Sequence, residues 1–358
     1  MNLNTPPPSA DAQLLFLTKL QRLFAEGDFT ATYKFALLIV LADLAVELGT
    51  DNGDSLDLTT REIGERFIQL YWHQTSPYVA SQPDATPKVL IQNNGAQAAV
   101  VSAIESFRAR TLCSSPLAAS KHPEYASLRA TVTQTVSAQP LTYLQNFAGG
   151  TDEFIYERPA RGLVRLKSGV AFCFRRFQPI LQEIARSNWV KHIKNNRLNH
   201  MILGVADDLE QFLFEASRQS LASLAVELLK VDGNNCFYCG APLNKVDVDH
   251  FIPFSLYPRD LAHNFLLAHP ACNRSKSSML AGRQHLERWL ERLAKRGDDI
   301  ADICLKAGIV VDAQACRRVV NWGYSNAYSS GATAWIRPGV FETVDRDFLS
   351  LAALGSPG

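Results

Sequence analysis

The sequence predicts an α+β protein that is mostly helical and carries a small zinc-stabilised module in its C-terminal half. Three observations lead to this prediction. Apolar side chains recur at helical spacing through most of residues 1–150. Short runs rich in β-branched and aromatic residues follow from about residue 154. Cys236-x2-Cys239 and His269-x2-Cys272 then form two short turns that together offer four zinc ligands.

Residues 1–150 are expected to form a helical N-terminal domain for recognition or regulation, ending near Gly149-Gly150. The stretch 33–48 is apolar nearly all round and should lie inside that domain. Thr59 and Glu62 have the spacing of a capping box at the start of a further helix. The other helices are expected at 11–25, at 96–109 and in one or two segments reaching about residue 147.

Residues 151–230 are expected to hold a hairpin and a basic helical connector to the zinc module. The runs LVRL and VAFCF flank Lys167-Ser168-Gly169, which is typical of a hairpin turn. A helix rich in positive charge is expected from about Phe177 to Arg197. Its charge indicates either a surface for a polyanion or a solvated helix face. The candidate nucleic-acid contacts in this segment are Arg186, Lys191, Lys194 and Arg197.

The paired knuckles predict a structural Zn²⁺ site. Three cysteines and one histidine form a closed set of four ligands, which leaves no open position for water. His263 is an alternative to His269, but its spacing to Cys272 suits a knuckle less well. The chain has 7 cysteines, an odd number, and this argues against a disulfide framework. The four cysteines outside the knuckles are expected to be buried thiols.

The residues between the knuckles predict two strands and a helix within a module at 231–282. VDVDHF alternates and should form a strand, a loop then carries Asn264, and a second strand covers about 265–268. A helix is expected from Asn273, and residues 283–358 should form a helical, aromatic-rich segment.

The order Asp249-His250, Asn264 and Asn273 between zinc knuckles resembles the HNH endonuclease family, whose nuclease module has a ββα-metal fold. The local sequences CFYCG, DHFIP and CNRSK are also similar to those of that family. The resemblance covers about 45 of the 358 residues, and it implies an enzyme that hydrolyses DNA phosphodiester bonds.

The resemblance also implies roles for individual residues. His250 would be the general base, and Asn264 would hold the loop and orient His250. Asp249 and Asn273 would hold a catalytic Mg²⁺ or Mn²⁺, and Asp247 competes with Asp249 because both share one strand face. Arg274 and Lys276 are candidate phosphate contacts.

The function expected from these features is a metal-dependent HNH endonuclease, similar to proteins of bacterial restriction and phage-defence systems. The alternatives are a zinc-stabilised nucleic-acid-binding protein without catalysis and a mobile-element homing nuclease. DNA is the expected partner, together with a second copy of the chain or a defence-system protein. No basic leader precedes an apolar segment, and the longest apolar run, 35–42, is far below the roughly 20 residues of a membrane span, so the expected location is the cytoplasm without membrane contact.

Overall fold

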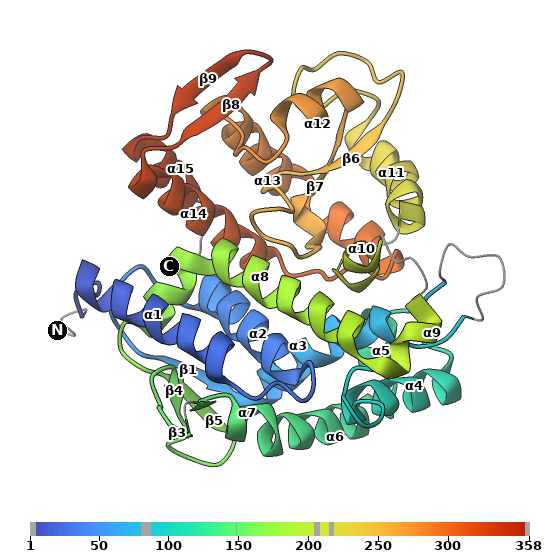
Figure 1. Ribbon diagram of the computed structural model, residues 1–358. Helices are drawn as coiled ribbons and strands as arrows, with labels where there is room; N and C mark the ends of the chain where they lie inside the picture. Colours follow the sequence, from blue (N-terminus) through green and yellow to red (C-terminus); the bar gives the residue numbers. More distant parts are fainter. Residues whose placement is uncertain (1–4, 80–86, 148, 204–207, 215–217, 355–358) are drawn as a thin grey trace. The chain divides into compact units, whose positions relative to one another are not determined.

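The structure is a computed structural model that describes residues 5–79, 87–147, 149–203, 208–214 and 218–354. It is a mixed α+β protein in which helices predominate (Figure 1). The chain divides into two compact units, Met1–Phe214 and Glu215–Gly358. Each unit is described here by itself. None of the described helices combines the length and the hydropathy that a bilayer crossing requires.

The first unit is a helical assembly around α2 (Tyr33–Leu48), which is buried along most of its length. The amphipathic pattern of the remaining helices turns their apolar faces toward this core. Thr59 and Glu62 form the expected capping box at the start of α3. The helices around α2 are α1 (Ala10–Glu26), α3 (Thr60–Trp72), α4 (Ala99–Thr111), α5 (Pro116–Ser120), α6 (Tyr125–Ala138), α7 (Pro140–Tyr143), α8 (Val170–Asn195), α9 (His200–Leu203) and α10 (Leu209–Phe214), with short 3₁₀ turns at His73–Thr75 and Arg197–Asn199.

A small antiparallel sheet in the order β1-β5-β4 joins two segments of this unit that are far apart in the sequence. Its strands are β1 (Leu56–Thr59), β4 (Tyr156–Glu157) and β5 (Leu163–Leu166), and a separate pair joins β2 (Asn146–Phe147) to β3 (Gly150–Thr151). Because β5 pairs with β1 and α8 packs against α2, residues 151–214 belong to the same unit as the first 150. The expected domain boundary at Gly149-Gly150 is therefore not the one that the structure shows.

The expected hairpin around Lys167-Ser168-Gly169 is wrong, because VAFCF forms the first turns of α8 and not a strand. Gly169 has a φ of +79° and directly precedes the helix, so it turns the chain out of β5 and into α8. A five-residue apolar run has no periodicity long enough to separate a buried helix from a strand. The hairpin that does form pairs β4 with β5.

The second unit contains two antiparallel strand pairs among its described residues. β6 (Asp247–His250) pairs with β7 (Phe265–Ala268), and β8 (Thr333–Arg337) pairs with β9 (Val340–Thr343). Its helices are α11 (Arg218–Asp232), α12 (Pro270–Lys276), α13 (Arg283–Lys306), α14 (Ala313–Ser330) and α15 (Arg346–Leu354), with a 3₁₀ turn at Ala262–Asn264. The strands expected between the knuckles are thus present, and α12 begins three residues before the expected Asn273.

Residues 283–358 are mostly helical, as expected, but they also contain the β8–β9 pair, which was not expected. Trp335 on β8 is 1% exposed and its indole Nε1 donates to Ser275 of α12. Among the C-terminal aromatics, Trp322, Tyr324, Trp335 and Phe348 are buried and serve packing, whereas Phe341 is exposed.

Candidate metal centre and the residues around β6

The four knuckle residues come together, as expected from their spacing. Cys236 and Cys239 lie in a tight turn after α11, where Gly240 has a φ of +73° and the N–H of Gly240 donates to the carbonyl of Cys236. His269 caps α12 at the end of β7, and Cys272 follows in the first turn of that helix. One ligand atom from each residue lies within 4.8 Å of all the others. His263 is not part of this cluster, and its Nε2 contacts the carbonyl of Gly297 instead.

The donor set fits a tetrahedral zinc ion. Zn–S and Zn–N bonds of about 2.3 and 2.0 Å put neighbouring donors of a tetrahedron about 3.5–3.8 Å apart. Sγ of Cys239 lies 3.4 Å from Nδ1 of His269. The other ring nitrogen, Nε2, lies 3.0 Å from the carbonyl of Pro242. A carbonyl can only accept, so Nε2 carries the proton and the lone pair of Nδ1 faces the sulfur atoms.

The thiols also show why a cation suits this cluster. Burial opposes ionisation of Cys236, but the N–H groups of Cys239, His269 and Tyr238 lower the pKa of that thiol to about 7. Burial together with the charges of Cys236 and Cys239 raises the pKa of Cys272 to about 12. A divalent ion removes this repulsion between thiolates and compensates for their burial.

Asp249 lies at the centre of a buried polar cluster between β6 and α12. Its Oδ2 accepts a hydrogen bond of 2.6 Å from the Tyr238 hydroxyl and lies 3.2 Å from Nζ of Lys276. Its Oδ1 accepts a 2.7 Å bond from the N–H of His250. Asp249 is 7% exposed, and each of its carboxylate oxygens thus has a partner within the protein.

Lys276 corrects an expectation, because it is not a surface residue. It is 0% exposed, and its ammonium group also donates to the carbonyl of His250 at 2.9 Å. Burial lowers the pKa of Lys276, and the charge of Asp249 raises it in opposition. Lys276 therefore joins α12 to the end of β6 and is not placed to contact the phosphates of a nucleic acid.

Asn273 contacts Asp247, the other acidic residue of β6. Nδ2 of Asn273 donates to Oδ2 of Asp247 at 3.2 Å. Asp247 and Asp249 both face α12, as expected for residues two apart on a strand. Asn273 and Lys276 are three residues apart on α12. Asn273 contacts Asp247, and Lys276 contacts Asp249. The side chain of Asn273 is thus paired with Asp247, not with the Asp249 that the resemblance implies.

The imidazole of His250 has different neighbours from the carboxylate of Asp249. Nε2 of His250 lies 2.8 Å from Oδ1 of Asp260. The ring packs against Phe265 and Phe254, with centroid distances of 4.7 and 5.3 Å. Asp260 only accepts when ionised, so this contact places the proton on Nε2 and leaves Nδ1 as the acceptor nitrogen.

Asn264 holds the turn that follows His250. Its Oδ1 accepts from the N–H of Ile252 at 2.8 Å, and its Nδ2 donates to the carbonyl of the same residue at 3.0 Å. Its own carbonyl accepts from the N–H of Phe251 at 2.7 Å. Asn264 is 2% exposed, so these bonds form away from water and fix the chain next to His250.

The other expected nucleic-acid contacts differ in exposure. Arg274 is exposed on α12 of the second unit. Lys191, Lys194 and Arg197 are exposed at the end of α8 and in the turn after it. Arg186 is partly buried, since its guanidinium stacks on Phe214 at 4.7 Å and donates to Gln182. Arg175 of the same helix is buried and paired with Asp51.

Two residues of this region could not be assigned from the sequence. Tyr238 lies inside the first knuckle motif, where its position gives no sign that its hydroxyl reaches Asp249. Asp260 follows His250 in a loop without any pattern that would connect the two. For Asp260, its polar side chain in the segment between β6 and β7 was the only available signal.

The comparisons with known proteins concern the first unit. The chain belongs to the family described as Domain of unknown function (DUF8808), whose model matches residues 15–207. Those residues include neither the knuckle cluster nor β6, β7 and α12. No curated protein and no solved structure matches the chain.

Proposed function

We propose that this chain is a metal-dependent HNH endonuclease that hydrolyses phosphodiester bonds of DNA. One observation carries the proposal. Strands β6 and β7 and helix α12, with a Cys3His cluster at the knuckles that flank them, gather His250, Asn264 and Asn273 in one small region. Their order in the sequence resembles that of the HNH family, and their arrangement is compatible with it.

His250 would take a proton from the attacking water through Nδ1. Asp260 holds the protonated Nε2, and Asn264 fixes the backbone after His250, so the ring is oriented before substrate binds. The carboxylate of Asp247 and the amide of Asn273 fit a hard divalent ion that keeps several waters, and their contact favours Asp247 over Asp249 as its acidic ligand. When bound, Mg²⁺ or Mn²⁺ supplies positive charge for the phosphate and the leaving oxygen.

The test is cleavage by the purified full chain with known zinc content. Supercoiled plasmid, linear DNA and single-stranded RNA are incubated with Mg²⁺ or Mn²⁺, and the same reactions without added metal serve as controls. Metal-dependent nicking or linearisation of the plasmid that disappears in His250→Ala is expected. Absence of cleavage of any substrate by protein that contains one zinc per chain would rule out the proposal.

One observation favours a second function, a zinc-stabilised nucleic-acid-binding module without catalysis. Both oxygens of Asp249 accept hydrogen bonds inside the fold, and Lys276 neutralises its charge. DNA binding that is unchanged by His250→Ala, without cleavage, identifies this function in the same experiment.

A role in restriction or phage defence rests on the resemblance alone. Such a role predicts that cells expressing the protein resist phage infection and that cells expressing His250→Ala do not.

One active site cuts one strand, so a double-strand cut would need two copies. Sizing the protein with and without DNA tests for such a dimer.

A further inference from the structure

A cavity of about 800 Å³ opens in the first unit, among the N-terminal end of α2, the start of α4 and the ends of α6 and α7. Its volume lies within the range of small-ligand sites, roughly 300–1,000 Å³. All the residues that line it fall within the part of the chain that matches the family model. The proposed nuclease chemistry uses none of them.

Lys34 is the buried cation of this cavity. It is 8% exposed although it is a lysine, and its side chain lines the cavity. Among the residues that the structure describes, its ammonium group has no carboxylate at ion-pair distance, and it lies 5.4 Å from the centroid of the Phe29 ring. Burial lowers the pKa of Lys34, and the charge of Asp28 partly offsets this effect. A buried cation without a partner is costly, so an anionic ligand would stabilise it.

Apart from Asp28, the rest of the lining is neutral and rich in amides. Five of the fifteen lining residues are asparagine or glutamine: Asn93, Gln97, Gln134, Gln139 and Asn146. Gln97 is used inside the fold, where it binds the backbone of residues 90–98, and Asn146 accepts from Thr151. The side chains of Asn93, Gln134 and Gln139 have no hydrogen-bond partner in the described part of the chain. Side-chain amides offer a donor beside an acceptor, which matches the edge of a nucleobase.

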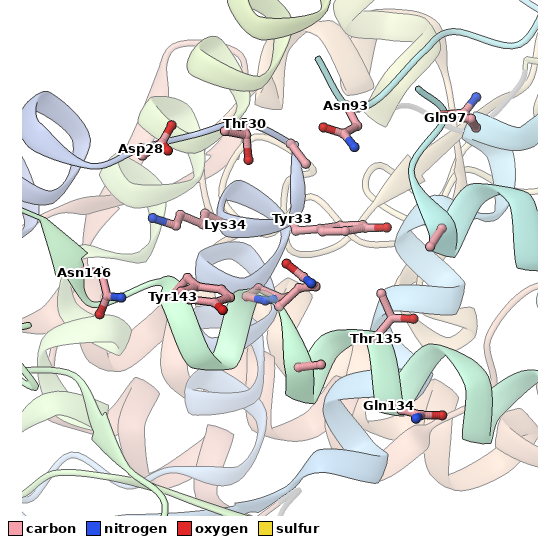
Figure 2. A pocket seen from close by; sticks show the side chains of 15 residues that line it. Asp28, Thr30, Tyr33, Lys34, Asn93, Gln97, Gln134, Thr135, Tyr143 and Asn146 are labelled. Atoms are coloured by element: carbon pink, nitrogen blue, oxygen red, sulfur yellow. The ribbon is translucent and has the colours of Figure 1, made fainter. Parts of the chain in front are cut away.

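Aromatic rings complete the cavity. The ring of Tyr33 lies between the Lys34 end and the Gln97 and Thr135 end (Figure 2). The N–H of Val100 donates to the Tyr33 hydroxyl at 3.0 Å and fixes that ring. Tyr143 lies toward the Lys34 end and is 48% exposed, so its ring offers a surface for stacking (Figure 2).

We propose that this cavity binds a nucleotide, with its phosphate at Lys34 and its base among the amides and tyrosines. The inference does not depend on the proposed nuclease activity. Two ligands carry a phosphate and a base in this way: a free nucleoside monophosphate and the terminal nucleotide of a nucleic-acid strand.

The test is calorimetric titration of the full chain with the common ribo- and deoxyribonucleoside monophosphates. Inorganic phosphate, ribose 5-phosphate and the free nucleosides are the comparators, and a short single-stranded oligonucleotide tests the second source. At least one monophosphate is expected to bind more tightly than phosphate and ribose 5-phosphate. Lys34→Met should weaken this binding by about 10- to 100-fold, which is the size of a charge-assisted hydrogen bond.

Two further variants make the test specific. Lys121→Met replaces an exposed lysine that does not line the cavity, and it should bind like the parent. Gln134→Ala, on the exposed side of α6, should weaken the binding of the nucleotide but not of inorganic phosphate. Lys34→Met should keep or raise the melting temperature, because it removes an unpaired buried charge. Failure of every nucleotide to bind, parent-like binding by folded Lys34→Met, or equal affinity for ribose 5-phosphate would overturn the proposal.

Discussion

Nε2 of His250 lies 2.8 Å from a carboxylate oxygen of Asp260, ten residues further along the chain. The contact turns an isolated histidine into an oriented pair, in which Asp260 fixes the tautomer and the direction of the ring. It gives the proposed mechanism a positioning residue that no motif in the sequence marks.

The first prediction concerns this pair. His250→Ala should lower the cleavage rate by about 10²–10⁴-fold while the protein still folds and binds DNA, because only the general base is lost. Asp260→Ala should cause a smaller loss, and Asp260→Asn should recover part of it, since an amide oxygen still accepts from Nε2. Asp298→Ala changes an exposed acid of α13 and is the matched control. Plasmid cleavage and DNA affinity are measured for all four variants, and parent-like cleavage by His250→Ala would contradict the mechanism.

The second prediction concerns zinc. Cys272→Ser should reduce the zinc content below one ion per chain and destabilise the second unit, because metal binding there contributes to folding. Cys113→Ser changes a thiol of the first unit outside the cluster and should keep its zinc. Elemental analysis and thermal unfolding report both effects. Full zinc occupancy in folded Cys272→Ser would show that the cluster is not the zinc site.

The third prediction separates the two acids of β6. Asp247→Asn should leave stability nearly unchanged but impair the use of Mg²⁺, with partial recovery at raised Mn²⁺. Asp249→Asn should instead destabilise the second unit by about 3–5 kcal/mol, because it leaves Lys276 buried without its charged partner. Adding Lys276→Met to Asp249→Asn should restore much of that stability. Denaturant unfolding and metal-dependent cleavage distinguish the two roles, and a stable Asp249→Asn protein with a Mg²⁺ defect would return the ligand role to Asp249.

The fourth prediction concerns pH and the first unit. Burial and the charge of Glu47 raise the pKa of Asp43 from 3.8 to about 7. The folded state therefore holds this proton more tightly than the unfolded state, so the contribution of Asp43 to stability is full below about pH 4 and is lost as the pH rises to about 7. Asp43→Asn keeps an acceptor for Gln178 and Gln182 and should be more stable than the parent above pH 7. Denaturant unfolding of the parent and of Asp43→Asn, measured from about pH 4 to above pH 7, checks this prediction, and Asp11→Asn changes an exposed acid as the control.

The fifth prediction concerns the exposed lysines of α8. Replacing Lys191 and Lys194 by Glu should weaken DNA binding regardless of sequence. If both contact phosphates, the slope of log affinity against log salt should fall by about 2. Lys121→Glu is the control. An unchanged affinity and slope would assign these lysines to a solvated helix face.

The sequence was informative where a pattern is local. The knuckle spacing predicted the Cys3His cluster, and the alternation of VDVDHF predicted β6. Features that depend on distant parts of the chain could not be predicted. VAFCF is a helix because α8 packs on α2, and Lys276 is buried because Asp249 and Tyr238 meet it across the module. The β8–β9 pair lacked a run of alternating residues long enough to separate it from the helices around it.

The pairing of β1 with β5 has a consequence for how the protein is made. Asp57 and Arg165 are bonded across these strands although they are 108 residues apart. Helix α2, apolar on nearly every side, packs against α8, which is complete only when the chain has been made as far as Asn195. A nascent or truncated chain that stops near residue 150 therefore exposes the face of α2 that α8 covers. Such a fragment is expected to aggregate or to engage chaperones, whereas one that extends through residue 214 contains all the elements of the first unit.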